Sequence, residues 1–146
     1  MSEDTARFAD ALMEISRHFA VMERDQVCCG DVSIPQCTAL QRLRREVCDA
    51  STLAEYLGTS RSATTRLIDG MEKRGWLERT PDPEDGRRVL LVLSDDGEVR
   101  ADELRQSTEQ LVGILMSEIA EDKRADVAKA LVVLGDALGR CRWRCC

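Results

Sequence analysis

The sequence has a single histidine, no CxxC pair and no Cys-x5-Arg phosphate loop. A cysteine hydrolase needs a base close to its thiol, and a thiol reductase uses two closely spaced cysteines. A cysteine-dependent redox enzyme is therefore the weaker hypothesis for this chain. The lone histidine, His18, also argues against a mixed Cys/His metal site, and we expect it to be a surface or interface residue.

Long apolar runs are also missing. No stretch approaches the roughly 18 consecutive apolar residues of a membrane-spanning helix, so we expect no membrane partner. The first ten residues are acidic and lack the apolar segment of a signal peptide. A cytoplasmic location is the resulting expectation.

Basic residues are outnumbered by acidic ones overall but not in the middle of the chain. The net charge of −6 weakly opposes binding to nucleic acid. Residues 40–88 nevertheless carry ten basic and nine acidic side chains, against eleven and eighteen in the rest of the chain. The middle of the chain is therefore where an anionic partner would be tolerated.

Helical periodicity begins near the N-terminus. Up to about Arg24, apolar residues recur at alternating spacings of four and three, which predicts a helix with a coiled-coil type seam. The members of this seam are Phe8, Leu12, Ile15, Phe19 and Met22. A second helix is predicted to start at Ser33, where Gln36 completes a capping box.

Two more short helices are predicted before residue 75. Thr52 and Glu55 form the expected capping box of the first, and Gly58 ends it. Ser60 is a good N-cap for the second, which we expect to reach about Arg74. Its inner face should hold Ala63, Leu67, Ile68 and Met71. Its outer face should hold Arg61, Ser62, Thr64, Thr65 and Arg66.

The pattern then changes to extended chain. Two strands, Trp76–Thr80 and Val89–Leu93, are predicted around the turn PDPEDGR. Ser94 should cap a long helix with the apolar stripe Leu104, Leu111, Leu115 and Ile119. A last helix after the EDK tripeptide repeats the pattern at Val127, Leu131, Leu134 and Leu138. Continuing that spacing reaches Cys141 and Cys145.

Two short helices joined at GTS are a helix-turn-helix candidate, although they also fit an ordinary helical hairpin. Small hydroxyl side chains let a helix enter the major groove, and arginine can bind guanine through two hydrogen bonds. The strand pair favours a winged helix, whereas a plain helical interaction protein would leave the hairpin unexplained. Arg87 and Arg88 would reach the minor groove or its phosphates, and Asp85 would orient the Arg87 guanidinium. The predicted DNA contacts are thus Arg61, Ser62, Thr64, Thr65, Arg66, Asp85, Arg87 and Arg88.

The stretch TSRSATTRLIDGMEKRGWLERTPDPEDGRRVLLVLSDDG at 59–97 resembles the MarR family of bacterial transcription regulators. The recognition helix, the wing acid and arginine, and the exit from the second strand carry the resemblance. It implies a mainly α fold with a small β-hairpin wing. A winged helix-turn-helix lobe would span 33–94, and a helical dimerisation region would comprise 1–32 and 95–146. The family default is a homodimer that represses transcription from a pseudo-palindromic operator in double-stranded DNA.

Seven cysteines depart from the family pattern. In a reducing cytosol they are not expected to form a disulfide framework, and an odd number leaves one over. Cys37 and Cys48 are expected to pack as small apolar residues, as Cys141 and Cys145 would in an extended seam. Alternatively, a thiolate sensor of oxidants, soft metals or an iron–sulfur cluster would use Cys28, Cys29, Cys141, Cys145 and Cys146. With structural cysteines, the effector would instead be a small organic ligand between the lobes.

Overall fold

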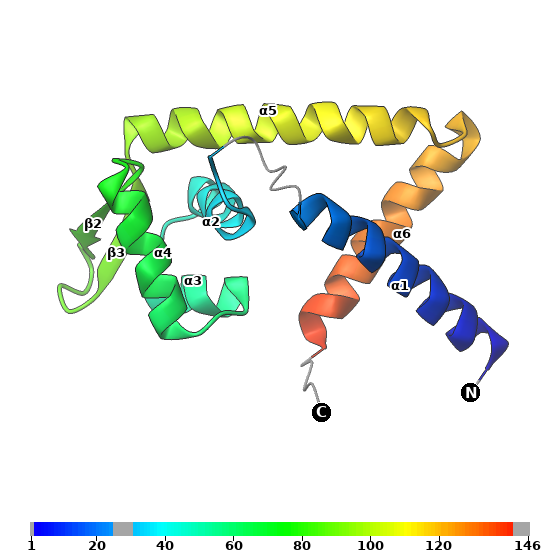
Figure 1. Cartoon of the computed structure of the whole chain (residues 1–146). Coiled ribbons are helices and arrows are strands. Elements are labelled where there is room, and N and C mark those ends of the chain that lie inside the picture. The colour runs from blue at the N-terminus through cyan, green and yellow to red at the C-terminus, as the bar shows by residue number, and fades with distance from the viewer. Residues whose placement is uncertain (1, 25–30, 142–146) are drawn as a thin grey trace. The chain divides into compact units, whose positions relative to one another are not determined.

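The computed structural model describes residues 2–24 and 31–141 (Figure 1). Contacts within the chain group it into two compact units, Met1–Ser107 and Thr108–Cys146. In the described ranges, no helix combines the length and apolar character needed to cross a membrane.

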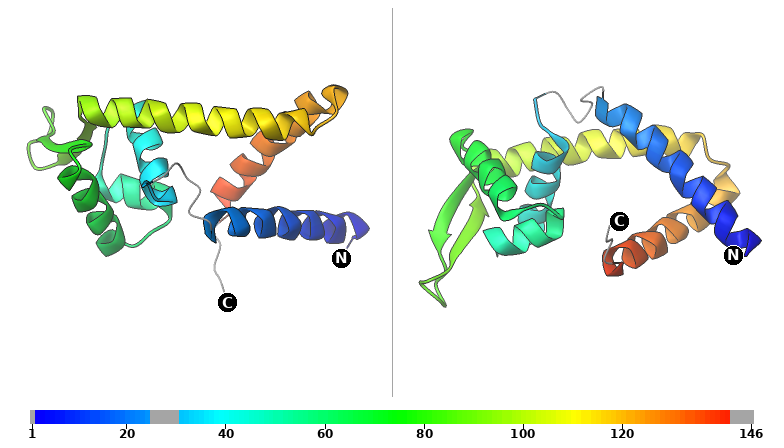
Figure 2. Two further views of the ribbon diagram at one scale, coloured as in Figure 1. Left: turned by 45° about the horizontal axis from the view of Figure 1, so that its top comes forward. Right: turned by 60° about the horizontal axis from the view of Figure 1, so that its bottom comes forward.

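The first unit contains a winged lobe of three helices and a small sheet. Its elements are α2 (Ile34–Arg45), β1 (Cys48–Asp49), α3 (Ala50–Leu57), α4 (Arg61–Lys73), β2 (Leu77–Pro81) and β3 (Val89–Leu93). The sheet is antiparallel with strand order β1-β3-β2. Figure 2 shows the β2–β3 hairpin extending beyond the helices of the lobe. The two predicted strands are confirmed to within a residue at their ends, and β1 was not predicted.

The lobe has its own apolar core. Each helix of the lobe contributes its inward face, and β2 and β3 contribute one buried residue each. The helix that follows β3 completes the core with Ala101 and Leu104. The fully buried side chains include Leu40, Leu53, Ile68, Met71, Leu77, Leu91 and Leu104. Burial of this many large side chains, each worth about 1.5–3 kcal/mol, stabilises the lobe from within.

Helix caps fix where the helices of the lobe begin. The capping box of Ser33 and Gln36 is present, and Ser60 accepts a hydrogen bond from the backbone N–H of Ala63 at 3.2 Å. The predicted box of Thr52 and Glu55 is wrong. Asp49 is the N-cap of α3, and its carboxylate accepts from the Thr52 N–H at 2.8 Å. The helix starts earlier because the chain leaves β1 directly into it, which makes Thr52 its third residue.

The exit from β3 is held tightly against the chain that leaves α4. Ser94 donates from its backbone N–H to the Trp76 carbonyl at 3.1 Å, and its hydroxyl accepts from the Gly97 N–H at 3.1 Å. A Cβ at Gly97 would lie 1.8 Å from the Trp76 carbonyl oxygen, so only glycine fits there. The Arg74 guanidinium stacks 4.7 Å from the centre of the Trp76 ring.

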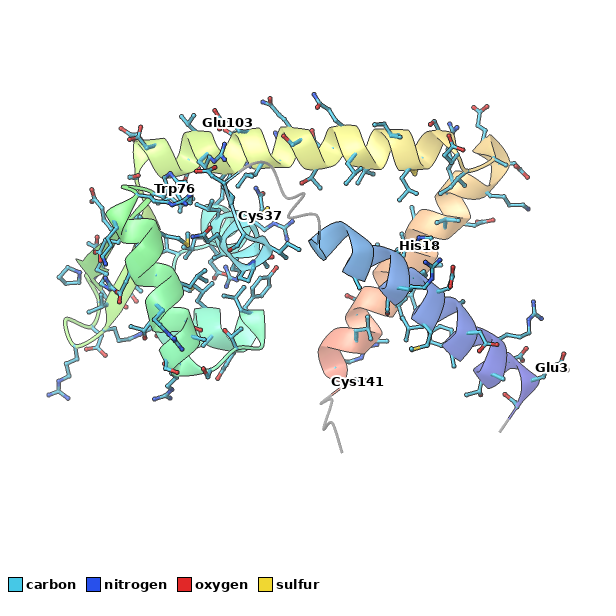
Figure 3. The ribbon with its side chains drawn as sticks, in the orientation of Figure 1. Glu3, His18, Cys37, Trp76, Glu103 and Cys141 are labelled. Carbon is cyan, nitrogen blue, oxygen red and sulfur yellow. The ribbon has the colours of Figure 1, made fainter. Side chains whose placement is uncertain are left out.

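Three long helices complete the described chain: α1 (Glu3–Arg24), α5 (Asp95–Ser117) and α6 (Glu121–Arg140). The last of these begins within the EDK tripeptide rather than after it. Of the predicted stripe on α5, Leu104 is buried while Leu111 and Leu115 are exposed. His18 is exposed on α1, as expected (Figure 3).

Candidate nucleic-acid interface

Four of the five residues predicted for the outer face of α4 are exposed to solvent, and one is buried. Arg61, Ser62, Thr65 and Arg66 are exposed. Thr64 is only 1% exposed, so its assignment to the outer face is wrong. It lies four residues before Ile68 and therefore falls on the buried side of the helix.

The Thr64 hydroxyl instead holds the turn of the helix-turn-helix together. It donates to the Ser60 carbonyl at 3.0 Å and lies 2.8 Å from the Thr59 hydroxyl. Both contacts join the first turn of α4 to the residues that precede it. Thr64 therefore supports the start of α4 from beneath, and its side chain is out of contact with solvent.

The exposed polar groups of α4 differ in what they can still bind. Thr65 donates its hydroxyl to the Arg61 carbonyl at 2.9 Å, which leaves its oxygen as an acceptor. The Arg66 Nε lies 3.4 Å from the Ser62 carbonyl, a weak contact that leaves both terminal nitrogens available. Among the described residues, none pairs with the Arg61 guanidinium. The face thus presents two arginines whose terminal nitrogens no described residue engages.

The wing loop is shaped by its aspartates. The Asp82 carboxylate accepts from the Glu84 N–H at 2.9 Å, and the Asp85 carboxylate accepts from the Arg87 N–H at 3.1 Å. The prediction that Asp85 orients the Arg87 guanidinium is therefore wrong. A carboxylate two residues before an amide is well placed for an Asx turn, so it bonds to the backbone instead.

The two wing arginines occupy different environments. Arg87 is exposed at the loop, and no described residue pairs with its guanidinium. Arg88 places Nη2 3.0 Å from Asp49 and Nη1 3.5 Å from Asp82. The hydrogen bond to Asp49 raises the pKa of Arg88. The sequence predicts both arginines at the tip of the wing, and the structure shows that, among the described residues, only Arg88 of the two is paired with carboxylates of the lobe.

A further arginine ties the wing to the recognition helix. Arg79 on β2 lies 2.6 Å from Asp69 and also pairs with Glu72, both on α4. Arg79 is not among the contacts predicted from the sequence. The signal was available, since Asp69 and Glu72 are three apart on a helix and therefore share a face.

The cysteines that the structure describes do not gather. Cys48 is buried, and desolvation raises the pKa of its thiol, while Cys37 packs at the edge of the core. Their predicted packing roles are confirmed. Cys141 is exposed at the end of α6 (Figure 3), and Cys28, Cys29, Cys145 and Cys146 lie outside the described residues. Within residues 2–24 and 31–141, no cluster of metal-ligating side chains is present.

Comparisons with known proteins point to one family. A family model described as MarR family matches residues 31–88. The multiple antibiotic resistance protein MarR of Escherichia coli K12 is 31% identical over 106 residues, which cover 71% of this chain and 71% of that protein. A shorter match joins the chain to the uncharacterised HTH-type transcriptional regulator YfiV of Bacillus subtilis. It is 37% identical over 67 residues and spans 45% of this chain but only 42% of YfiV.

Solved structures share the fold over nearly the whole chain. A MarR family protein from Bacillus stearothermophilus has a TM-score of 0.80 at 22% identity, covering 96% of this chain and 99% of that chain. Streptococcus pneumoniae FabT in complex with DNA has 0.73 at 20%, covering 92% and 96%. Bordetella bronchiseptica BpsR, whose DNA binding is regulated by 6-hydroxynicotinic acid, has 0.70 at 19%, covering 88% and 92%.

Proposed function

Because the chain belongs to the MarR family of transcriptional regulators, we propose that it represses transcription by binding a pseudo-palindromic operator as a homodimer. In this proposal α4 enters the major groove and the wing reaches the adjacent minor groove. The observation that carries it is the pair of exposed guanidiniums, Arg61 on α4 and Arg87 on the wing, which no described residue neutralises.

Each proposed contact has its own chemistry. Arg61 and Arg66 can donate to guanine or phosphate, while Thr65 can accept from a base or lay its methyl group against thymine. Arg87 suits the negative potential of a narrow minor groove. Asp85 supports this contact by shaping the loop, and Thr64 supports the start of α4. Ser62 at the first turn of α4 suits a phosphate contact.

The homodimer is proposed because the long helices leave apolar side chains uncovered within one chain. Phe8 and Phe19 on α1 are 56% and 59% exposed, and Leu115 on α5 is 59% exposed. Large apolar side chains left exposed along a helix commonly mark a protein interface. A second copy offers the same surfaces, and two lobes would then match two half-sites about one helical turn apart.

DNA selected from a random pool, followed by titration at several salt concentrations, tests the proposal. Arg87→Ala should weaken binding to the selected duplex about tenfold and lower the salt slope by about one. Arg45→Ala is the matched control, because Arg45 is exposed at the end of α2 and carries the same charge. Equal effects of the two substitutions, or no selection of any sequence, would contradict the proposed interface.

The effector is a separate proposal with two forms. A thiolate sensor would use Cys28, Cys29 and the tail cysteines, in which case Ser substitution of the pair or truncation after Arg140 removes the response to soft metals and oxidants but keeps DNA binding. An organic ligand would act as 6-hydroxynicotinic acid does on BpsR. Cysteine variants that respond like the wild type would favour the organic ligand.

A further inference from the structure

Arg88 follows the wing-tip residue Arg87, yet its guanidinium lies back against the body of the lobe. One terminal nitrogen is 3.0 Å from Oδ2 of Asp49, and the other is 3.5 Å from Oδ2 of Asp82. Asp49 ends β1 on the far side of β3, while Asp82 begins the wing loop. A single side chain therefore connects the end of the loop with its beginning and with the start of α3.

Both carboxylates are already engaged with the backbone. Asp49 caps α3 through the Thr52 N–H, and Asp82 accepts from the Glu84 N–H at 2.9 Å. The backbone closes the same ring, because Asp82 donates its N–H to the Arg88 carbonyl at 3.0 Å. The guanidinium thus contacts two carboxylates whose own positions are fixed, which limits how far the hairpin can swing.

The charges of this group cancel much of what Arg88 could offer to DNA. The hydrogen bond from the Thr52 backbone N–H holds the pKa of Asp49 below its usual range. Hydrogen bonds from the Thr52 and Arg88 side chains add to this effect. Asp49 and Arg88 are therefore both ionised near neutral pH. A guanidinium between two carboxylates adds little positive potential, whereas no described carboxylate pairs with the Arg87 guanidinium.

We propose that Arg88 is a positioning residue that, with Asp49 and Asp82, holds the wing at a fixed angle to α3 and α4. Arg87 then reaches DNA from a fixed place while Arg88 itself neutralises no phosphate. The inference rests on the proposed DNA binding for its consequence, but the link between wing and lobe can be measured without DNA.

Backbone ¹⁵N relaxation of the free protein tests the link itself. Arg88→Ala, Arg88→Lys and Asp49→Asn should each lower the order of the Glu84–Arg87 amides, while helix amides stay as in the wild type. Lysine keeps the charge but lacks the fork that contacts two carboxylates, and asparagine keeps the α3 cap. Glu84→Gln is the control, because it removes an exposed wing charge that no described partner holds. Wing amides that remain as ordered as in the wild type would overturn the link.

Titration with the selected duplex tests the consequence. Arg88→Ala, Arg88→Lys and Asp49→Asn should each weaken binding about threefold to tenfold, with an unchanged salt slope, and the Arg88→Ala/Asp49→Asn pair should be no weaker than either single variant. If Arg88 contacts phosphate instead, Arg88→Lys binds like the wild type, Arg88→Ala lowers the slope by about one, and Asp49→Asn binds at least as tightly as Glu84→Gln.

The two levels of the proposal fail in distinguishable ways. If the wild-type chain binds no DNA, the proposed function is wrong, and the relaxation data still decide whether Arg88 holds the wing. If the wild type binds and the slope falls with Arg88→Ala, the proposed function stands and the positioning role is overturned.

Discussion

The winged lobe and the last helix, α6, differ in how far their apolar side chains are buried within this chain. The lobe buries large side chains from every helix it contains, whereas α6 has no buried residue within this chain. Leu131, Val132 and Val133 on α6 are 55–67% exposed. The lobe therefore carries its stability internally, and we expect that of α6 to depend on association.

The largest expected effect comes from placing a charge on the uncovered helix. Leu131→Arg should raise the dissociation constant of the proposed dimer at least about 100-fold, because an unpaired charge would be buried at the interface. DNA binding should fall with it, while the lobe remains folded. Sedimentation velocity measures the dimer dissociation constant, and circular dichroism checks that the lobe remains folded. Glu121→Arg, at the exposed start of α6, should leave the dimer intact.

Truncating one leucine in each region sharpens the contrast. Leu53 is fully buried in the lobe, so Leu53→Ala should destabilise it by about 2–5 kcal/mol at any protein concentration. Leu131→Ala should lower the melting temperature in a concentration-dependent way, as expected where stability comes from association. Thermal melts over a hundredfold range of concentration make the comparison. A concentration-independent loss from Leu131→Ala would remove the distinction.

Two glycines on α5 repeat the contrast on one helix. Gly97→Ala should cost about 1–3 kcal/mol or more, because the added Cβ meets the Trp76 carbonyl. At Gly113 an added Cβ meets no atom of the described residues within 4 Å, so Gly113→Ala should stabilise the helix by about 0.5–1 kcal/mol. Urea denaturation measures both. A stabilised Gly97→Ala variant would show that α5 does not press on the chain at Trp76.

The smallest effect is the acid dependence of the lobe. Because the folded-state pKa of Asp49 is lowered, its contribution is present above the unfolded value of about 3.9 and is lost as pH falls through the folded pKa. Asp49→Asn should therefore lower the free energy of unfolding near neutrality and flatten its pH dependence over that acidic window, where the two proteins converge. Urea midpoints measured between neutral and acidic pH give this slope, and an identical slope in both proteins would count against the shift.

Local signals predicted most of the fold. The caps at Ser33 and Ser60, the strand pair and the exit at Ser94 all depend on short-range chemistry, and the structure confirms them. The cap of α3 was missed because β1 is a two-residue strand whose pairing with β3 is long-range. Helical periodicity puts Thr64 on the same face as Ile68, four residues later, and the outer-face prediction was wrong because it followed the polar hydroxyl instead of this spacing.

The residue types of the candidate interface were predictable from the sequence, but the different environments of its arginines were not. Adjacent arginines at 87 and 88 look equivalent in sequence, and the carboxylate that separates them, Asp49, lies 39 residues before Arg88. The same holds for Arg79, whose partners are on a different element. Ion pairs across elements depend on tertiary geometry, which a single sequence does not display.

The central claim is that self-sufficient lobes are paired through the uncovered helices to read DNA. Sedimentation velocity of the chain with a duplex selected from a random pool tests it most directly. The account predicts a dimer at micromolar concentration and two chains on each duplex, with both lost in Leu131→Arg. A monomer that binds the same duplex as a single chain, with undiminished affinity, would contradict it.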